Sequence, residues 1–309
     1  MQEVLKLAPV FKERIWGGKQ LEAVFDYQIP SNHTGECWAI SAHPNGTSLI
    51  TNGVLKGRML DDVFAKEKYL FNHTPAERFP LLTKILDANM DLSVQVHPKD
   101  DYALKHENDL GKTECWYILD CKTDATMIYG HTARTKEELV SEINHQKWDR
   151  LLRRIPIHKG DFFYVPAGTV HALCEGTLVL ETQQSSDTTY RLYDYDRKDE
   201  QGLLRPLHIS KALDVITTPH IDYMMTPVTH QTKTAAITIF VKDTYFTVSK
   251  WEINGDYHYT HDIYHLISVI EGHGIINGEQ VKKGDHIIIT SVAKAISVSG
   301  TLTLIASHP

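Results

Sequence analysis

Short apolar runs, each broken after a few residues by Gly, Pro, Asn or Asp, make up most of this chain of 309 residues. Three examples are LSVQVH at 92–97, DFFYV at 161–165 and TLVLETQQ at 177–184. Runs of this length with turn residues between them are typical of strands in a β-sandwich or β-barrel. The sequence therefore predicts a mainly β fold.

Helical patterns are few, and we expect them at the periphery of the sheets. The clearest covers residues 135–154, where Thr135 and Glu138 match a capping box. Leu139 and Ile143 then fall on one face of the same helix. Shorter helices are predicted at three further places, Lys19–Phe25, Met59–Lys66 and Pro206–Ile216.

Charge and composition favour a protein that handles small solutes. The net charge is −7, so nucleic acid is not the expected partner. No apolar run approaches the roughly 20 residues of a membrane helix, so we expect no membrane association. The start, MQEVLKLAPVFKERIWGG, has no basic region followed by a long apolar core, and we expect no signal peptide.

The cysteines also indicate the compartment. They show no CxxC spacing, and each has an apolar, strand-like context: Cys37, Cys115, Cys121 and Cys174. Free buried thiols in a reducing cytoplasm are the simplest interpretation. We therefore expect a cytoplasmic protein.

One motif carries specific chemistry. It has the form G-x5-P-x-G-x2-H, with its fixed positions at Gly160, Pro166, Gly168 and His171. Such a motif is a strand, a turn set by Pro and Gly, and a His that begins the next strand and points into a barrel. This is the second signature of the cupin superfamily, although Glu175 replaces its usual closing Asn.

A second polar pair lies on the first of the strand-like runs. Leu92, Val94 and Val96 alternate with polar residues, so Gln95 and His97 are expected to point the same way. The first cupin signature normally supplies two His and a Glu. Here the chain offers this Q-x-H pair and, on the next strand-like run, the Glu of GKTECW at 111–116.

Together these positions form a candidate metal site, with the ligands Gln95, His97, Glu114 and His171. Two imidazoles, one carboxylate and one neutral amide oxygen suit Zn²⁺ and leave room for water or substrate. A lone His on a strand is more often structural, so the prediction of one Zn²⁺ per chain depends on the joint pattern.

The chain also contains an internal repeat. Residues 157–173 (IHKGDFFYVPAGTVHAL) align with residues 280–296 (QVKKGDHIIITSVAKAI) through a shared KGD and the apolar strand after it. In the second copy Thr290, Val292 and Ala295 replace the Pro, Gly and His of the motif. His261 and His265 lie near the expected places of other ligands, but we see no third partner.

The expected fold is therefore two cupin-like (jelly-roll) β-barrels with a few peripheral helices. Residues 217–234, with two Pro, many Thr and no periodicity, are a plausible boundary. We expect residues 1–225 to form the metal-binding catalytic domain with its peripheral helices. Residues 226–309 are expected to form a cupin-like domain without metal ligands.

The chain resembles the type I mannose-6-phosphate isomerases (phosphomannose isomerases) in their short bacterial form. The matching stretches are WGG (16–18), GECWAIS (35–41), FPLLTKILDANMDLSVQVHPKD (79–100), GKTECWYIL (111–119), PAGTVHAL (166–173) and EGTLVLETQQSSDTTYRLYD (175–194). Two features depart from the longer members. The helical insertion with Y-x-D-x-N-H-K-P-E is missing, and their R-A-G reads Arg191-Leu192-Tyr193, so the local phosphate or sugar contacts are expected to differ.

The resemblance implies that the four ligand positions bind zinc. It also implies that Arg191, after the Ser-Asp pair, and Lys112, two residues before the metal Glu, are catalytic. Lys84, Glu36 and Trp16 are expected to contact the substrate, although a structural role is the simpler interpretation of Trp16. Salt bridges from Lys84 or Arg191 to Asp87 or Asp187 are the alternative to a functional role for these two cations.

The residues also fit this chemistry directly. Moving a proton between C1 and C2 of a sugar phosphate needs a Lewis acid, a base and cations for the phosphate. Zn²⁺ would be the first, and a Lys beside it should have a lowered pKa. Arg191 is suited to a phosphate or a developing oxyanion.

The sequence thus predicts a zinc-dependent isomerase that interconverts mannose 6-phosphate and fructose 6-phosphate through a cis-enediol. Another cupin enzyme, such as a phosphoglucose isomerase or an iron oxygenase, and a non-catalytic sugar-phosphate-binding cupin are the alternatives. An oxygenase is disfavoured because an amide ligand crowds the open positions that O₂ requires. The sequence leaves the oligomeric state open.

Overall fold

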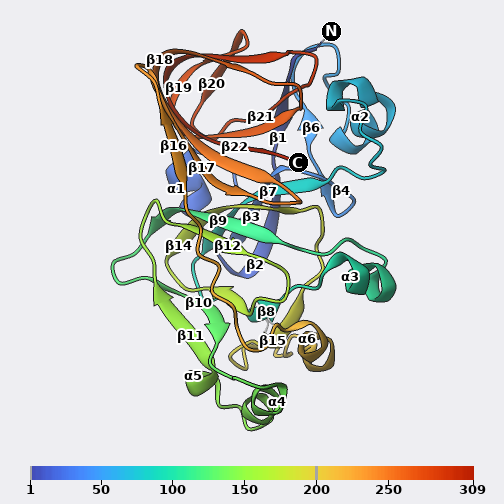
Figure 1. The fold of residues 1–309 in the computed structure, drawn as a ribbon, viewed down its shortest axis with the longest axis vertical. Coiled ribbons are helices and arrows are strands. Elements are labelled where there is room, and N and C mark those ends of the chain that lie inside the picture. Colours follow the sequence, from blue (N-terminus) through green and yellow to red (C-terminus); the bar gives the residue numbers. More distant parts are fainter. Residues whose placement is uncertain (1, 199–200) are drawn as a thin grey trace.

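The computed structural model describes residues 2–198 and 201–309 and confirms a mainly β, cupin-like fold. Three sheets are stacked along the long axis of the molecule, with the C-terminal strands at the top of the view and short helices at the edges (Figure 1). All strand pairs are antiparallel. The sheets pack face to face and bury a separate apolar cluster between each pair.

The middle and lower sheets carry the candidate site. The six-stranded sheet has the order β12 (Phe162–Val165), β9 (Glu114–Cys121), β14 (Thr177–Gln184), β7 (Leu81–Ala88), β3 (Thr34–Ile40) and β2 (Val10–Gly18). The five-stranded sheet has the order β11 (Leu152–Pro156), β10 (Thr126–His131), β13 (His171–Leu173), β8 (Val94–Val96) and β15 (Tyr190–Tyr193). Strands β7 and β14 are buried at every residue, so their polar and charged side chains must find partners within the protein.

The upper sheet contains the C-terminal strands and two strands from the other end of the chain. Its order is β16 (Val228–Gln231), β17 (Ala235–Lys242), β18 (Thr247–Thr260), β22 (Ala295–His308), β19 (His265–Ile276), β21 (His286–Ile289), β1 (Val4–Ala8) and β6 (Leu49–Ile50), and β20 (Glu279–Lys282) pairs with β19. A separate pair is formed by β4 (Ala42–His43) and β5 (Gly46–Thr47). The N-terminal strand therefore completes the C-terminal sheet.

The helices are short and peripheral, as expected. They are α1 (Gln20–Phe25), α2 (Leu60–Lys66), the 3₁₀ helix η1 (Lys68–Phe71), α3 (Asp100–Glu107), α4 (Lys136–Asn144), α5 (Trp148–Leu151) and α6 (Ile209–Val215). Within residues 2–198 and 201–309, none is long and apolar enough to cross a membrane.

The predicted helix over residues 135–154 is correct at its start and wrong in its length. Thr135 Oγ1 accepts a hydrogen bond from the backbone N–H of Glu138 at 3.2 Å, as the capping box requires. The helix ends at Asn144 because Gln146 adopts a left-handed conformation with φ of 53°. After the single turn of α5, the chain enters β11, whose pairing with β10 overrides the helical pattern.

The internal repeat is present in the structure. In the first KGD turn Asp161 accepts a hydrogen bond from the backbone N–H of His158 at 2.8 Å. In the second, Asp285 accepts one from Lys282 at 3.0 Å. The glycine before each Asp has a positive φ, 93° and 90°, which a residue with a Cβ rarely adopts. The two copies therefore share the turn that starts strands β12 and β21.

The division into domains of residues 1–225 and 226–309 stays a prediction. A test of it must take β1 into account, because this N-terminal strand pairs with β21 of the C-terminal sheet. Leu5 pairs in register with Ile288 of β21, and its side chain is fully buried. Without β1, the edge of β21 would leave its backbone groups unpaired and an apolar cluster exposed.

We expect a fragment of residues 226–309 alone to aggregate or to unfold at a lower temperature than the same fragment with residues 2–9 joined through a flexible linker. The added strand would pair with β21 and cover its edge. Thermal unfolding followed by circular dichroism compares the two, and a matched control carries the same eight residues in scrambled order. Equal melting temperatures for all three would contradict the prediction.

A buried carboxylate lies at the start of α1. Asp87 on β7 is 1% exposed and accepts a hydrogen bond from the backbone N–H of Gln20 at 2.7 Å. Burial raises the pKa of Asp87 to about 6, and this hydrogen bond offsets the effect only in part. Because the folded protein holds this proton more tightly than the unfolded chain, its stability should fall as pH rises from about 4 to 6.

Asp87→Asn should therefore increase the free energy of unfolding by about 2 kcal/mol at pH 7.5 and leave it unchanged near pH 4. Asn keeps an oxygen for the Gln20 N–H but carries no charge. Urea unfolding at both pH values, with metal content held constant, measures the difference. A variant that is less stable than the wild type at pH 7.5 would show that the charged form of Asp87 is stabilising.

Candidate metal centre and active site

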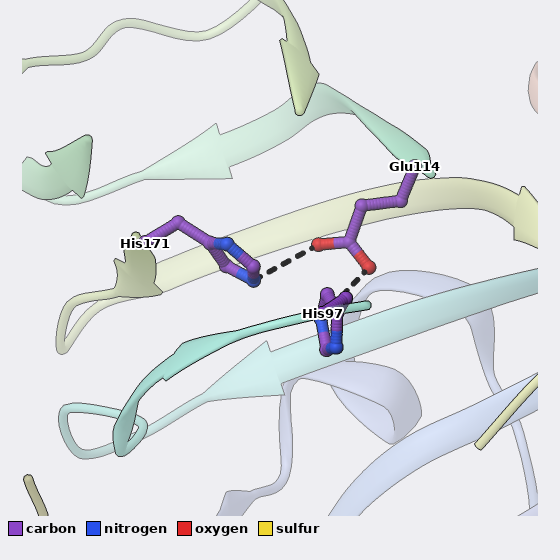
Figure 2. A group of neighbouring side chains, drawn as sticks. All are labelled: His97, Glu114 and His171. Carbon is purple, nitrogen blue, oxygen red and sulfur yellow. Dashed lines mark ion pairs between the residues drawn. The ribbon is translucent and has the colours of Figure 1, made fainter. Parts of the chain in front are cut away.

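Three buried side chains converge where strands of the two lower sheets begin or end. His97 directly follows β8, Glu114 begins β9 and His171 begins β13. Each imidazole faces a different oxygen of the carboxylate (Figure 2): His97 Nε2 is 3.4 Å from Glu114 Oε2, and His171 Nε2 is 3.2 Å from Oε1. In the described part of the chain, this is the one group of three or more His, Cys, Asp or Glu side chains that could hold a metal ion, and its possible ligand atoms all lie within 4.8 Å of one another.

The hydrogen bonds of the two imidazoles prepare them as ligands. His97 Nδ1 is 2.9 Å from the carbonyl oxygen of Thr188, and His171 Nδ1 is 2.9 Å from that of Thr169. A carbonyl only accepts, so each Nδ1 carries a proton and Nε2 is the ring atom left to bind a metal. Burial and then the charge of Lys112 lower the pKa of His97 well below its usual value, which keeps this ring neutral.

The carboxylate of Glu114 fits a bound cation. Its side chain is fully buried, and neither oxygen accepts a hydrogen bond of regular geometry. A buried carboxylate without regular donors is costly unless positive charge compensates it. Two neutral nitrogens and one carboxylate oxygen are the donor set of many catalytic zinc sites.

Gln95 lies beside this centre. It is paired in register with His171 on one side and with Arg191 on the other, and its Nε2 is 3.4 Å from His171 Nε2. The flanking residues of β8, Val94 and Val96, pack into the apolar cluster on the far side of the strand, as the alternation predicts. Ligation of a metal by the Gln95 oxygen stays a prediction.

The alternation does not extend to Leu92. This residue precedes β8 and packs into the cluster between the six- and five-stranded sheets, whereas the expected position was on the other side with the two valines. The strand covers only three residues, so its period cannot place a residue outside it.

A cavity of about 480 Å³ opens next to the metal centre. All six predicted site residues outside the three-residue cluster line it: Trp16, Glu36, Lys84, Gln95, Lys112 and Arg191. They come from six separate segments of the sequence, and the two lower sheets bring them together. The cavity also has walls that were not predicted, among them Arg14, Glu181 and Arg205.

Lys112 contacts the metal-binding cluster directly. Its Nζ is 2.9 Å from Glu114 Oε2 and 3.3 Å from His97 Nε2. Burial would lower the pKa of Lys112, but the negative charges of Glu114 and Glu181 outweigh it and raise the pKa above its usual value. The protein's own groups thus act against the lowered pKa that we expected from a neighbouring Zn²⁺.

Lys84 belongs to a row of paired side chains that crosses the six-stranded sheet. In register, Trp38, Lys84, Glu181 and Trp116 lie on four successive strands. Lys84 Nζ is 3.6 Å from Glu181 Oε1, and Trp116 Nε1 donates to Glu181 Oε2 at 2.9 Å. The alternative ion pairs of Lys84 with Asp87 or Asp187 are therefore wrong, since its partner is Glu181.

Glu181 itself was missed by the sequence analysis. The sequence feature that could have identified Glu181 is its position in the strand TLVLETQQ, in which the structure buries every residue. A charged residue in the middle of such a strand requires a partner in the protein. Neither residue type nor spacing identifies that partner as a Lys on the adjacent strand.

Glu36 is held firmly in the wall formed by the six-stranded sheet. Arg14 donates to its two oxygens at 2.9 and 3.1 Å, and Trp38 Nε1 donates at 2.6 Å. Burial would raise the pKa of Glu36, but the charges of Lys84 and Arg14 lower it to about 2. Trp16 is 4% exposed and forms part of the apolar cluster behind the site, so it both lines the cavity and supports the wall.

Arg191 differs from the other cations of the cavity. It forms no ion pair within the described residues, so the alternative pairing with Asp187 is wrong as well. One Nη1 hydrogen bond goes to the carbonyl oxygen of Pro206 at 2.8 Å, and its buried Nε has no partner.

The fold and these contacts define a cupin with a buried His-Glu-His centre and a cation-rich cavity. The comparisons identify the family. The type I phosphomannose isomerase catalytic domain matches residues 4–117, and the mannose-6-phosphate isomerase cupin domain matches residues 236–309. A mannose-6-phosphate isomerase of Bacillus subtilis, ManA, is 53% identical over 312 residues, 99% of each chain. The chain belongs to the type I phosphomannose isomerase family.

Solved structures agree with this assignment. The crystal structure of the mannose 6-phosphate isomerase from Bacillus subtilis covers 100% of both chains at 52% identity, with a TM-score of 0.97. A mannose 6-phosphate isomerase bound with zinc and yttrium shares the fold at 16% identity, with a TM-score of 0.79 over 99% of each chain.

His97→Ala and Glu114→Gln should each remove the bound metal and the activity together, because each deletes one ligand of a three-residue centre. Elemental analysis of the purified variants measures the metal. His230→Ala, a change at an exposed histidine of β16, is the control and should keep full metal content. Retention of metal by both site variants would show that the ion binds elsewhere.

Proposed function

We propose that this chain is a zinc-dependent aldose-ketose isomerase that interconverts mannose 6-phosphate and fructose 6-phosphate through a cis-enediol. The observation that carries the proposal is the buried centre of His97, Glu114 and His171, which contacts Lys112 and Gln95 in the lining of a cavity with five cationic side chains. Full-length relatives with this activity support the substrate.

The residues of the centre would hold one Zn²⁺ per chain through two Nε2 atoms and the Glu114 carboxylate, with Gln95 as a weaker fourth ligand. When bound there, Zn²⁺ supplies a Lewis acid that polarises the substrate carbonyl and stabilises negative charge on its oxygen. Thr188 and Thr169 fix the two imidazole rings through their carbonyl groups.

Proton transfer between C1 and C2 requires a group that can hold a proton beside the metal centre. Lys112 is our catalytic assignment, since its Nζ contacts both His97 and Glu114 and lines the cavity. Glu181 is a second candidate: it lines the same wall, and its Oε1 accepts no hydrogen bond. Lys84 lies 3.6 Å from that carboxylate and can orient it.

Arg191 is our second catalytic assignment, because a permanently charged guanidinium without an ion-pair partner is available to the substrate. Lys84, Glu36 and Trp16 would contact the sugar from the facing wall. Trp16 offers an apolar face, and the Glu36 carboxylate, already held by Arg14, can accept a hydrogen bond from a hydroxyl.

Two wider expectations belong to the same proposal. The four cysteines form no disulfide, which fits a reducing cytoplasm. The cavity's cations fit a small sugar phosphate as the partner, while the absence of nucleic-acid and membrane partners stays a prediction from composition.

A phosphoglucose isomerase would require the same electrostatics, so direct assays must separate the two. We expect turnover of mannose 6-phosphate and none of glucose 6-phosphate in coupled assays, and loss of turnover when the metal is chelated. Restoration by added Zn²⁺ is the control for irreversible damage. Full activity in a preparation shown to be metal-free would rule out the mechanism.

Arg191→Ala should lower kcat by roughly 100-fold, which corresponds to about 3 kcal/mol of transition-state stabilisation. Metal content and melting temperature should stay unchanged, because Arg191 does not contact the three ligands. Arg150→Ala, at an exposed arginine of α5, is the matched control. Near-normal turnover of the Arg191 variant would remove this residue from the site.

A further inference from the structure

The cations that line the cavity differ in how completely they are neutralised. Three of them face a carboxylate within 4 Å: Arg14 with Glu36, Lys84 with Glu181 and Lys112 with Glu114. Arg191 faces none in the described part of the chain, and Arg205 shares its carboxylate with a second arginine. Excess positive charge is therefore concentrated at Arg191 and Arg205.

The shared carboxylate is Asp194, which is 4% exposed. It accepts hydrogen bonds from Arg205 through Nε at 2.8 Å and Nη2 at 2.5 Å, and from Arg197 through Nη2 at 2.6 Å. Burial would raise the pKa of Asp194, but these hydrogen bonds hold it below its usual value. The two-point contact fixes the plane of the Arg205 guanidinium and leaves Nη1 free of hydrogen bonds to the described residues.

Arg191 and Arg205 are held next to each other. Arg191 Nη1 donates to the carbonyl of Pro206, the residue after Arg205, at 2.8 Å. The backbone N–H of Arg191 also donates to His208 Nδ1 at 3.1 Å, and that of His208 donates to Arg191 O at 2.7 Å. Burial, followed by the positive charge of Arg205, lowers the pKa of Arg191, as expected for a guanidinium that lacks a counter-ion of its own and lies beside a second one.

The remaining carboxylates of the cavity do not supply that counter-ion. Asp187 accepts a hydrogen bond from Asn45 Nδ2 at 3.1 Å, and Glu13 lies on an exposed position of β2. Neither lies within 4 Å of Arg191 or Arg205. An anion from outside the protein is therefore the natural partner of this pair.

We propose that Arg205 and Arg191 together bind the phosphate group of the substrate and that Asp194 positions Arg205 for this contact. The proposal rests on the proposed function for its substrate. A phosphate monoester carries a charge of about −1.5 to −2 at pH 7 and matches the planar N–H groups of arginine. Gln95 lies opposite Arg191 in register and touches the metal centre, so the sugar would lie between the metal and the two arginines.

This assignment also gives a role to a segment outside the family motifs. The R-A-G of the longer members is replaced after Arg191 in this chain, and Arg205 lies fourteen residues later in a loop between β15 and α6. The loop returns to β15 through the Asp194 and Pro206 contacts, so a cation distant in sequence reaches the same cavity wall.

Arg205→Met tests the proposal, with Arg197→Met as the matched control. Both changes remove one guanidinium from Asp194, but only Arg205 lines the cavity. For Arg205→Met we expect kcat/KM for mannose 6-phosphate to fall about 100-fold, and for Arg197→Met less than about threefold. Arg205→Lys keeps the charge without the two-point contact and should lose about tenfold.

Binding of inorganic phosphate, measured by calorimetry at low salt, separates this proposal from the proposed function. Phosphate should bind the wild type and Arg197→Met with similar affinity, and Arg205→Met at least tenfold more weakly. Equal phosphate affinity of the wild type and Arg205→Met would overturn the proposal even if the isomerase activity is real. If Arg205→Met does not fold, the same comparison with Arg205→Lys decides, and unchanged affinity and kcat/KM would again overturn it.

Discussion

The fully buried carboxylate of Glu114 sets the electrostatic requirements of this site. A negative charge with no contact to solvent must be compensated by positive charge close by. Lys112 supplies one positive charge at 2.9 Å, and each imidazole faces the same carboxylate through Nε2 while its Nδ1 proton is donated to a backbone carbonyl. A bound metal ion would add positive charge beside the same carboxylate, and the negative charges of Glu114 and Glu181 raise the pKa of Lys112. Buried Glu181 in the neighbouring wall is compensated in the same way, by the charge of Lys84 and by a hydrogen bond from the indole N–H of Trp116.

The sheets make these contacts possible because antiparallel register places residues from distant parts of the sequence opposite one another. Glu181 meets Lys84 on one side and Trp116 on the other, while Gln95 meets His171 and Arg191. A slip of one residue in either sheet would turn these side chains to the opposite face. The apolar residues that alternate with them, such as Leu178 and Leu180 on β14, pack into the core beneath the C-terminal sheet and so hold the register.

Much of the fold and of the metal centre could be predicted because both follow from local patterns. The turn with Pro166 and Gly168 identifies His171, and the Q-x-H spacing identifies the strand opposite it. The length of the helix that begins at residue 136 could not be predicted, since Gln146 ends α4 with a left-handed conformation and the pairing of Leu152–Pro156 with β10 overrides the rest of the helical pattern. Glu181 and Arg205 were missed for a related reason. Their roles depend on a partner, Lys84 or Asp194, that only the tertiary structure brings within reach.

The second copy of the repeat shows how a cupin unit is built without the buried carboxylate of the candidate metal centre. In the first copy Glu114 pairs in register with Val165 at the end of β12, and in the second His265 pairs with Ile289 at the end of β21. His265 therefore stands where the first copy has its carboxylate. Burial, with the neighbouring His308 and His261, lowers the pKa of His265 to about 3, so this side chain is neutral at physiological pH and needs no counter-charge. Exchanging a buried carboxylate for a neutral ring removes the demand for a cation, and the second unit can serve as a packing partner that takes β1 into its sheet.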